Sequence, residues 1–310
     1  PPFFLMIRRP PRSTLFPYTT LFRSNATGCS SIWGGPGATS PYCTDKNGHG
    51  PAWSNSLFED NAEHGYGMYT AQKVIRENLA EKTHALLAID WTAAELKEAA
   101  QKWLDTMEDG AANKEAAKAY IAALEESICD GCDCDACKLA SEILSQKDYL
   151  SKKSVWIFGG DGWAYDIGFG GVDHVLAQNE DVNIFVFDTE VYSNTGGQAS
   201  KASNIGQVAQ FAAAGKETKK KSLAEIAMSY GYIYVAQVAM GANQAQTLKA
   251  IAEAEAYHGP SLIIGYAPCE MHSIKGGMMH CQEEMKKAVD CGYWNMFRFD
   301  PSKEIGRAHV

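Results

Sequence analysis

Short apolar runs alternate with helix-like segments through the second half of the chain, and this alternation limits the possible folds more than any other feature. The apolar runs cover residues 154–158, 182–187, 233–238 and 261–266. They are continuously apolar, which is typical of parallel strands buried on both faces. We therefore expect an α/β fold: a doubly wound, mainly parallel sheet with helices on both faces.

Helical periodicity separates the expected strands. The expected helices cover residues 164–178, 205–214, 223–230, 243–258 and 278–291. Ligands of such sheets bind beyond the carboxyl ends of the strands. Three loops lie at such ends, at 159–163, 188–200 and 267–277, and they are the candidate site.

Residues 92–152 interrupt this pattern with a segment rich in Ala, Glu and Lys. Thr92 and Glu95 have the T-x-x-E spacing of a capping box. Asn113 is suited to cap a second helix that ends near residue 128, and a third helix is expected from 137 to about 147. The segment is predicted to be a helical insertion, and another long helix is expected from about Leu57.

The two ends of the chain differ from the rest. Residues 1–24 contain five prolines and four arginines but no acid. Neither helix nor strand is expected through so many prolines, and the positive charges follow the short apolar run, unlike a secretory signal. The segment resembles a translated sequencing adapter, as does 304–310, although a disordered native tail is the alternative. The domain is then expected to span 25–303 and to be a fragment of a longer protein.

Composition excludes several classes of function. The chain has 28 Lys+Arg against 37 Asp+Glu, which argues against nucleic acid or an anionic membrane as the main partner. No apolar run is long enough to span a membrane. The nine cysteines are odd in number and unevenly spaced. They indicate metal or cluster ligands in a reducing, cytoplasmic compartment more than a disulfide framework.

A Gly-Asp-Gly sequence, Gly160–Gly162, follows the first expected strand and precedes a helix. Glycines there allow backbone N–H groups to approach a diphosphate, and Asp161 offers a carboxylate to its divalent cation. Thr189 ends the next strand, and the following turn offers the Val191 carbonyl. Because adjacent parallel strands end at one edge, we expect these groups to reach one ion. By itself, Gly-Asp-Gly also fits an ordinary tight turn.

The amino-acid sequences of these motifs are more specific than their spacing. GGDGWAYDIGFGGVDHVLA (159–177) and FDTEVYSNTGGQASKAS (187–203) resemble the last catalytic domain of the pyruvate:ferredoxin (flavodoxin) oxidoreductase family. Residues 25–34, 50–68 and 292–301 resemble the same family. The resemblance covers 25–303, with the insertion its least distinctive part.

The resemblance implies a thiamine diphosphate site with Mg²⁺ held by Asp161, the Thr189 side chain and the Val191 carbonyl. Asn194 would point toward the thiazolium carbon and the 2-oxo acid, although Asn is also a good turn former. The other implied cofactor-binding residues are Gly160, Gly162, Trp163, Phe58 and Thr27. For Trp163 and Phe58, ordinary core packing is the alternative.

The resemblance also assigns Cys29 and Cys269 as ligands of a [4Fe-4S] cluster. Such a cluster needs four thiolates. The family's other two come from a Cys-x₂-Cys pair shortly before the position of Asn25, where this chain has the adapter-like segment instead. The ligand set is therefore expected to be incomplete. Four further cysteines form C-x₂-C-x-C-x₂-C outside the recognised motifs: Cys129, Cys132, Cys134 and Cys137. A bound metal and a reduced interhelical loop both remain open for them.

The implied function is oxidative decarboxylation of pyruvate to acetyl-CoA and CO₂, with electrons passing through iron–sulfur clusters to ferredoxin or flavodoxin. The full-length enzyme would be a homodimer, and this fragment by itself would be inactive. One alternative is a ferredoxin oxidoreductase for another 2-oxo acid. A nonoxidative thiamine decarboxylase is disfavoured by Cys29 and Cys269. A noncatalytic subunit, with the acidic insertion as a scaffold, is the alternative from another class.

Overall fold

The computed structural model describes residues 21–26, 52–56, 59–90, 92–129 and 134–303. The chain divides into two compact units. One is helical and consists mainly of residues 68–154; the other contains the sheet and consists mainly of residues from 155 onward. No helix in the described ranges is both long and apolar enough to cross a membrane.

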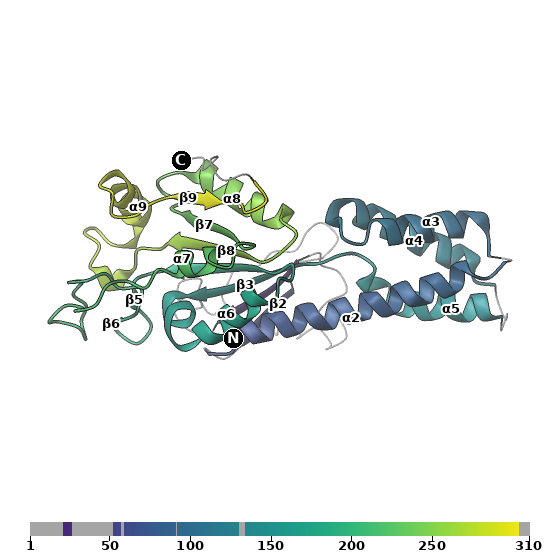
Figure 1. The fold of residues 1–310 in the computed structure, drawn as a ribbon, viewed down its shortest axis with the longest axis horizontal. Helices are drawn as coiled ribbons and strands as arrows, with labels where there is room; N and C mark the ends of the chain where they lie inside the picture. The colour runs from purple at the N-terminus through teal and green to yellow at the C-terminus, as the bar shows by residue number, and fades with distance from the viewer. Residues whose placement is uncertain (1–20, 27–51, 57–58, 91, 130–133, 304–310) are drawn as a thin grey trace, which may run out of the picture. The chain divides into compact units, whose positions relative to one another are not determined.

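A seven-stranded sheet forms the core of the sheet unit (Figure 1). Its strands are β1 (Leu21–Ala26), β2 (Ala52–Ser56), β3 (Ser154–Gly160), β4 (Asn183–Asp188), β7 (Tyr234–Val238), β8 (Ser261–Tyr266) and β9 (Phe297–Phe299). The order is β2-β1-β3-β4-β8-β7-β9. Pairing is parallel from β3 through β4 and β8 to β7, and β9 is antiparallel to β7.

The inner strand β8 shows that both faces of the sheet are covered. All six of its residues are buried, and successive side chains of a strand point to opposite faces. The expected mainly parallel α/β fold is therefore confirmed, as are the four expected strands, to within two residues at their ends.

Helices and a small hairpin connect these strands. The helices are η3 (Gly162–Ile167, a π-helical turn), α6 (Phe169–Ala177), α7 (Leu223–Met228), α8 (Gln244–Ala256), η4 (Glu270–His272), η5 (Met278–His280) and α9 (Cys281–Asp290). The hairpin pairs β5 (Val191–Tyr192) with β6 (Gln198–Ala199). Two of the helix starts have side-chain caps: Asn243 accepts from Gln246 N at 2.9 Å, and Ser222 accepts from Glu225 N at 3.3 Å.

Three of the expected helices differ from the structure. The one expected at 278–291 begins with the 3₁₀ turn η5 and continues as α9. The helix expected at 164–178 is divided into η3 and α6 at Gly168. The helix expected at 205–214 is wrong, because this segment forms turns with its ends hydrogen-bonded together. Gly206 N donates to Lys216 O at 2.7 Å, and Lys216 N donates to Gln207 O at 3.1 Å. Gly206 and Gly215 both have positive φ, which interrupts a helix.

The helical unit contains α2 (Asn61–Leu87) from residue 68 onward, α3 (Ala94–Asp105), α4 (Gly110–Ser127), α5 (Asp135–Ser145) and the 3₁₀ turn η2 (Lys147–Tyr149). Its buried core includes Leu79, Leu86, Trp103, Tyr120, Leu124, Ile143 and Leu150. Arg76 is buried beside this core. Its guanidinium donates to the carbonyls of Leu150 at 2.7 Å, Met107 at 2.7 Å and Tyr149 at 3.1 Å.

Both helix caps predicted for the insertion are wrong. Thr92 donates to Leu86 O instead of capping α3, which begins after Ala93 without a side-chain cap. Asp109 caps α4 by accepting from Ala111 N and Ala112 N. Asn113 lies one turn inside α4, where its Oδ1 accepts from Lys152 N at 2.6 Å. The expected third helix is present, two residues earlier than predicted.

Regular structure begins inside the predicted tail. β1 starts at Leu21, so the expectation of no strand in 1–24 is wrong for residues 21–24. Residues 1–20 and 304–310 lie outside the described ranges. The non-native origin assigned to the tails stays a prediction.

Candidate functional site

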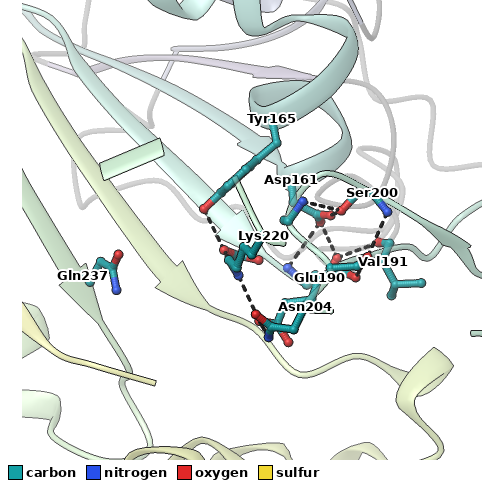
Figure 2. A network of polar contacts seen from close by, with 12 residues as sticks. Asp161, Tyr165, Glu190, Val191, Ser200, Asn204, Lys220 and Gln237 are labelled. Atoms are coloured by element: carbon teal, nitrogen blue, oxygen red, sulfur yellow. Dashed lines mark hydrogen bonds and ion pairs between the residues drawn. The ribbon is translucent and has the colours of Figure 1, made fainter. Parts of the chain in front are cut away.

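Asp161 lies at the centre of the candidate site. It directly follows β3 and is fully buried. Its Oδ1 accepts from Thr189 Oγ1 at 2.6 Å and Thr189 N at 3.3 Å, and its Oδ2 accepts from Ser200 Oγ at 2.5 Å (Figure 2). Thr189 follows β4, whose Phe187 pairs with Gly160 of β3. The ends of two adjacent parallel strands therefore meet here, as predicted.

The Val191 carbonyl joins the same cluster. Thr189 Oγ1 lies 2.9 Å from this carbonyl oxygen as well as 2.6 Å from Asp161 Oδ1. A hydroxyl has one proton, so it can donate fully to only one of these two acceptors. The three predicted magnesium ligands thus form a compact group of oxygens in which one hydroxyl proton is shared between two acceptors. Such a group suits a hard cation such as Mg²⁺. Their role as ligands stays a prediction.

Negative charge accumulates around this group. Asp161, Asp188 and Glu190 are all buried. In the described part of the chain, the ammonium that pairs with two of them is Lys220 Nζ, 2.8 Å from Asp188 and 2.9 Å from Glu190. Burial, and then the neighbouring Asp188, raise the pKa of Asp161 to about 7. A divalent cation would balance three carboxylates and one ammonium and would favour the ionised form of Asp161.

Two aromatic side chains occupy the space beside glycines in and around the Gly-Asp-Gly motif. A Cβ on Gly162 would lie 2.4 Å from Cε1 of Tyr192. Trp163 is fully buried, and its ring fills the space beside Gly159 and Gly168. Trp163 Nε1 has no hydrogen-bond partner among the described residues. The absence of a side chain at these glycines makes room for the aromatic rings. The ring of Trp163 is packed in the core, which was the alternative to a cofactor contact. The cofactor contacts of Gly160, Gly162 and Trp163 stay predictions.

The β5–β6 hairpin carries Asn194 and contacts Cys269. Asn194 is exposed in the turn between these strands. Its neighbour Ser193 lies 2.9 Å from the sulfur of Cys269, which is buried in the loop after β8. The structure therefore brings Cys269 close to the turn that presents Asn194. The catalytic role of Asn194 and the cluster role of Cys269 stay predictions, and Thr27, Cys29 and Phe58 lie outside the described residues.

The cysteines of the insertion form no described metal site. Cys134 Sγ accepts from Cys137 N at 3.4 Å and so caps α5, Cys137 is buried, and Cys129 is exposed. Cys132 lies outside the described residues. Within the described ranges, no three His, Cys, Asp or Glu side chains are grouped as metal ligands.

Several residues of the site were not predicted from the sequence. Ser200, Glu190 and Tyr165 complete the buried network, with Tyr165 OH donating to Asp188 at 2.8 Å. Lys220 lies inside the run Lys219–Lys221, which has the composition of a solvated surface. Only the acids flanking Thr189, in Asp-Thr-Glu, gave a signal in the sequence, because buried acids at a strand end need a positive partner.

The fold and the oxygen cluster define an α/β domain that has a candidate cation site at its strand ends. Comparison of the sequence with models of known protein families identifies the family of this domain. Residues 137–264 match the family described as thiamine pyrophosphate enzyme, C-terminal TPP binding domain.

Longer proteins match nearly all of the chain. A pyruvate-flavodoxin oxidoreductase from Klebsiella pneumoniae is 53% identical over 284 residues, which cover 91% of this chain and 23% of that relative. A pyruvate:ferredoxin oxidoreductase from Moorella thermoacetica is 54% identical and covers 90% and 23%. A mitochondrial pyruvate dehydrogenase [NADP(+)] from Euglena gracilis is 48% identical and covers 90% and 15%.

Residues 137–264 therefore match the thiamine pyrophosphate enzyme C-terminal domain, and about 90% of the chain is similar to pyruvate-flavodoxin and pyruvate:ferredoxin oxidoreductases. The chain spans about a quarter of the length of these two relatives. The resemblance stated from the motifs is confirmed.

Proposed function

We propose that this domain binds thiamine diphosphate and Mg²⁺ in an enzyme that oxidatively decarboxylates pyruvate to acetyl-CoA and CO₂. The observation that carries the proposal is the convergence of Asp161, Thr189 and the Val191 carbonyl at two adjacent strand ends. The family match over 137–264 supports the cofactor. The names of the relatives support the substrate.

Thiamine diphosphate, when bound, supplies the electron sink that makes decarboxylation of a 2-oxo acid feasible. Asp161, Thr189 Oγ1 and the Val191 carbonyl would hold the Mg²⁺ on its diphosphate. The burial of Asp161 and Asp188 keeps water away and strengthens their attraction for a cation. Asn194, in the hairpin turn, would orient the 2-oxo acid.

Electron transfer is the second part of the proposal. Cys269, and Cys29 outside the described residues, would supply two thiolates to a [4Fe-4S] cluster, with the other ligands from elsewhere in the enzyme. Ferredoxin or flavodoxin would accept the electrons and coenzyme A the acetyl group, in a cytoplasmic homodimer. The similar domain of a relative named for NADP(+) suggests that the acceptor is determined outside this domain.

The decisive experiment measures thiamine diphosphate binding by calorimetry, with and without Mg²⁺, in the full-length protein that carries this chain. We expect Mg²⁺-dependent binding that Asp161→Ala weakens at least about 100-fold, because even a partner of a metal ligand is worth 10- to 100-fold. Asp173→Ala is the matched control, since Asp173 accepts a hydrogen bond from Tyr230 on another part of the unit. Mg²⁺-independent binding, or unchanged binding in Asp161→Ala, would contradict the proposed site.

A further inference from the structure

Glu190 has an unusual backbone conformation at a critical position. It lies between Thr189 and Val191, the two residues that offer a hydroxyl and a carbonyl to the proposed cation. Its φ is +59°, in the left-handed region that a residue with a side chain adopts at a cost. Its side chain is 1% exposed. A strained, buried residue persists only where its surroundings hold it.

Three side chains hold the Glu190 carboxylate from separate parts of the sheet unit. Tyr293 OH donates to Oε2 at 2.6 Å. Asn204 Nδ2 donates to Oε1 at 3.0 Å, and Lys220 Nζ lies 2.9 Å from Oε1 (Figure 2). We call Glu190 with these three side chains the Glu190 clamp. The backbone carbonyl of Glu190 also accepts from Ser203 Oγ. Both carboxylate oxygens therefore already have donors, so Glu190 is not a free cation ligand.

Lys220 connects the clamp to the other neighbour of Thr189. The same Nζ lies 2.8 Å from Asp188 Oδ2, to which Tyr165 also donates. One ammonium thus binds the side chains of residues 188 and 190, and Thr189 lies between them. Asp188 itself ends β4, so the turn is fixed at the sheet on one side and by the clamp on the other.

We propose that the Glu190 clamp positions Thr189 Oγ1 and the Val191 carbonyl for a divalent cation, with Glu190 and Lys220 as positioning residues. The proposal rests on the proposed magnesium site. Tyr293 completes the clamp from 103 residues further along the chain. The clamp therefore makes cation affinity depend on the segment that follows α9.

The test measures the Mg²⁺ concentration that half-saturates thiamine diphosphate binding in the full-length protein. Tyr293→Phe removes one hydroxyl and keeps the ring, and Glu190→Gln removes the charge and keeps the shape. Each is expected to raise the half-saturating Mg²⁺ concentration about 10-fold, as for other partners of metal ligands. Excess Mg²⁺ should restore wild-type thiamine diphosphate affinity, because a positioning defect weakens the cation site without altering the diphosphate contacts.

Tyr257→Phe is the matched control, because Tyr257 OH donates to Tyr232 O at 2.6 Å elsewhere in the same unit. It should leave the half-saturating Mg²⁺ concentration within about 2-fold, well below the 10-fold effect of a metal-ligand partner. If Glu190→Gln fails to fold, Tyr293→Phe alone decides. A Tyr293→Phe protein that melts earlier yet keeps the wild-type Mg²⁺ requirement would reduce the clamp to a structural role and overturn the inference. If the wild-type protein shows no Mg²⁺-dependent thiamine diphosphate binding, that result contradicts the proposed function and therefore also the inference that rests on it.

Discussion

The Thr189 hydroxyl connects the acceptor oxygens of the candidate cation site. It contacts both Asp161 and the Val191 carbonyl with only one proton to donate. Asp161 and Thr189 could be predicted from the sequence because each follows an apolar run that forms a strand. The sequence placed Ser200 only within the candidate loop 188–200 and did not indicate Lys220, because both belong to irregular segments whose return to the site depends on tertiary contacts.

Substitution of Thr189 should separate the hydroxyl from the rest of the side chain. Thr189→Val is expected to weaken Mg²⁺-dependent thiamine diphosphate binding at least about 10-fold, because an oxygen ligand is lost. It should also lower the free energy of unfolding of the metal-free protein by about 1–2 kcal/mol, because the buried Asp161 loses a donor. Thr189→Ser should retain both properties. Equal binding by the Val and Ser variants in calorimetry would exclude the hydroxyl as a ligand.

Gly162 is required by a close contact. Gly162→Ala would place a methyl group 2.4 Å from the Tyr192 ring, and overpacking of this kind costs about 1–3 kcal/mol. Gly170 is a helical glycine with no atom within 4 Å of an added Cβ. Gly170→Ala should therefore be neutral or stabilise by up to about 1 kcal/mol. Urea unfolding of the two variants checks this contrast, which equal effects would contradict.

At the scale of elements, the strands were more predictable than the helices. The continuous apolar runs of β3, β4, β7 and β8 are too short for buried helices and are bounded by loops, which favours a buried strand. The segment 205–214 has helical spacing of apolar residues, but Gly206 and Gly215 adopt positive φ. Phe211 N also donates to Gly197 O at 2.9 Å, outside any helix. Tertiary hydrogen bonds thus replace the local ones that the periodicity predicts.

Arg76 connects three parts of the helical unit. Its guanidinium donates to three carbonyls, from Met107, Tyr149 and Leu150. Burial lowers its pKa to about 10, so it stays charged at neutral pH. Arg76→Met leaves these carbonyls without their donor and should lower the free energy of unfolding by about 2–4 kcal/mol. Lys118→Met is the control, because its pair with Glu115 is exposed to solvent and should contribute little to the free energy of unfolding. Urea denaturation followed by circular dichroism measures both variants, and similar losses would contradict this account.

At the scale of the whole molecule, the chain covers 23% of the length of the pyruvate-flavodoxin and pyruvate:ferredoxin oxidoreductases that it matches. We expect the isolated 310-residue chain to show no pyruvate-dependent reduction of a viologen dye under anaerobic conditions. The full-length protein should reduce the dye with pyruvate and coenzyme A and should prefer pyruvate to 2-oxoglutarate. Dye reduction by the isolated chain would show that this domain is sufficient, and a preference for 2-oxoglutarate would change the proposed substrate.

The parallel pairing of β4 with β8 has a consequence for electron transfer. Asp188, at the end of β4, pairs with Tyr266, at the end of β8. Thr189 follows the first strand by one residue, and Cys269 follows the second by three. Neighbouring strands are about 4.8 Å apart, and hydrogen bonds keep them so. The sheet therefore restricts the separation between the proposed cofactor site and the proposed cluster thiolate. Electron tunnelling between them would then occur over a distance that thermal motion changes little.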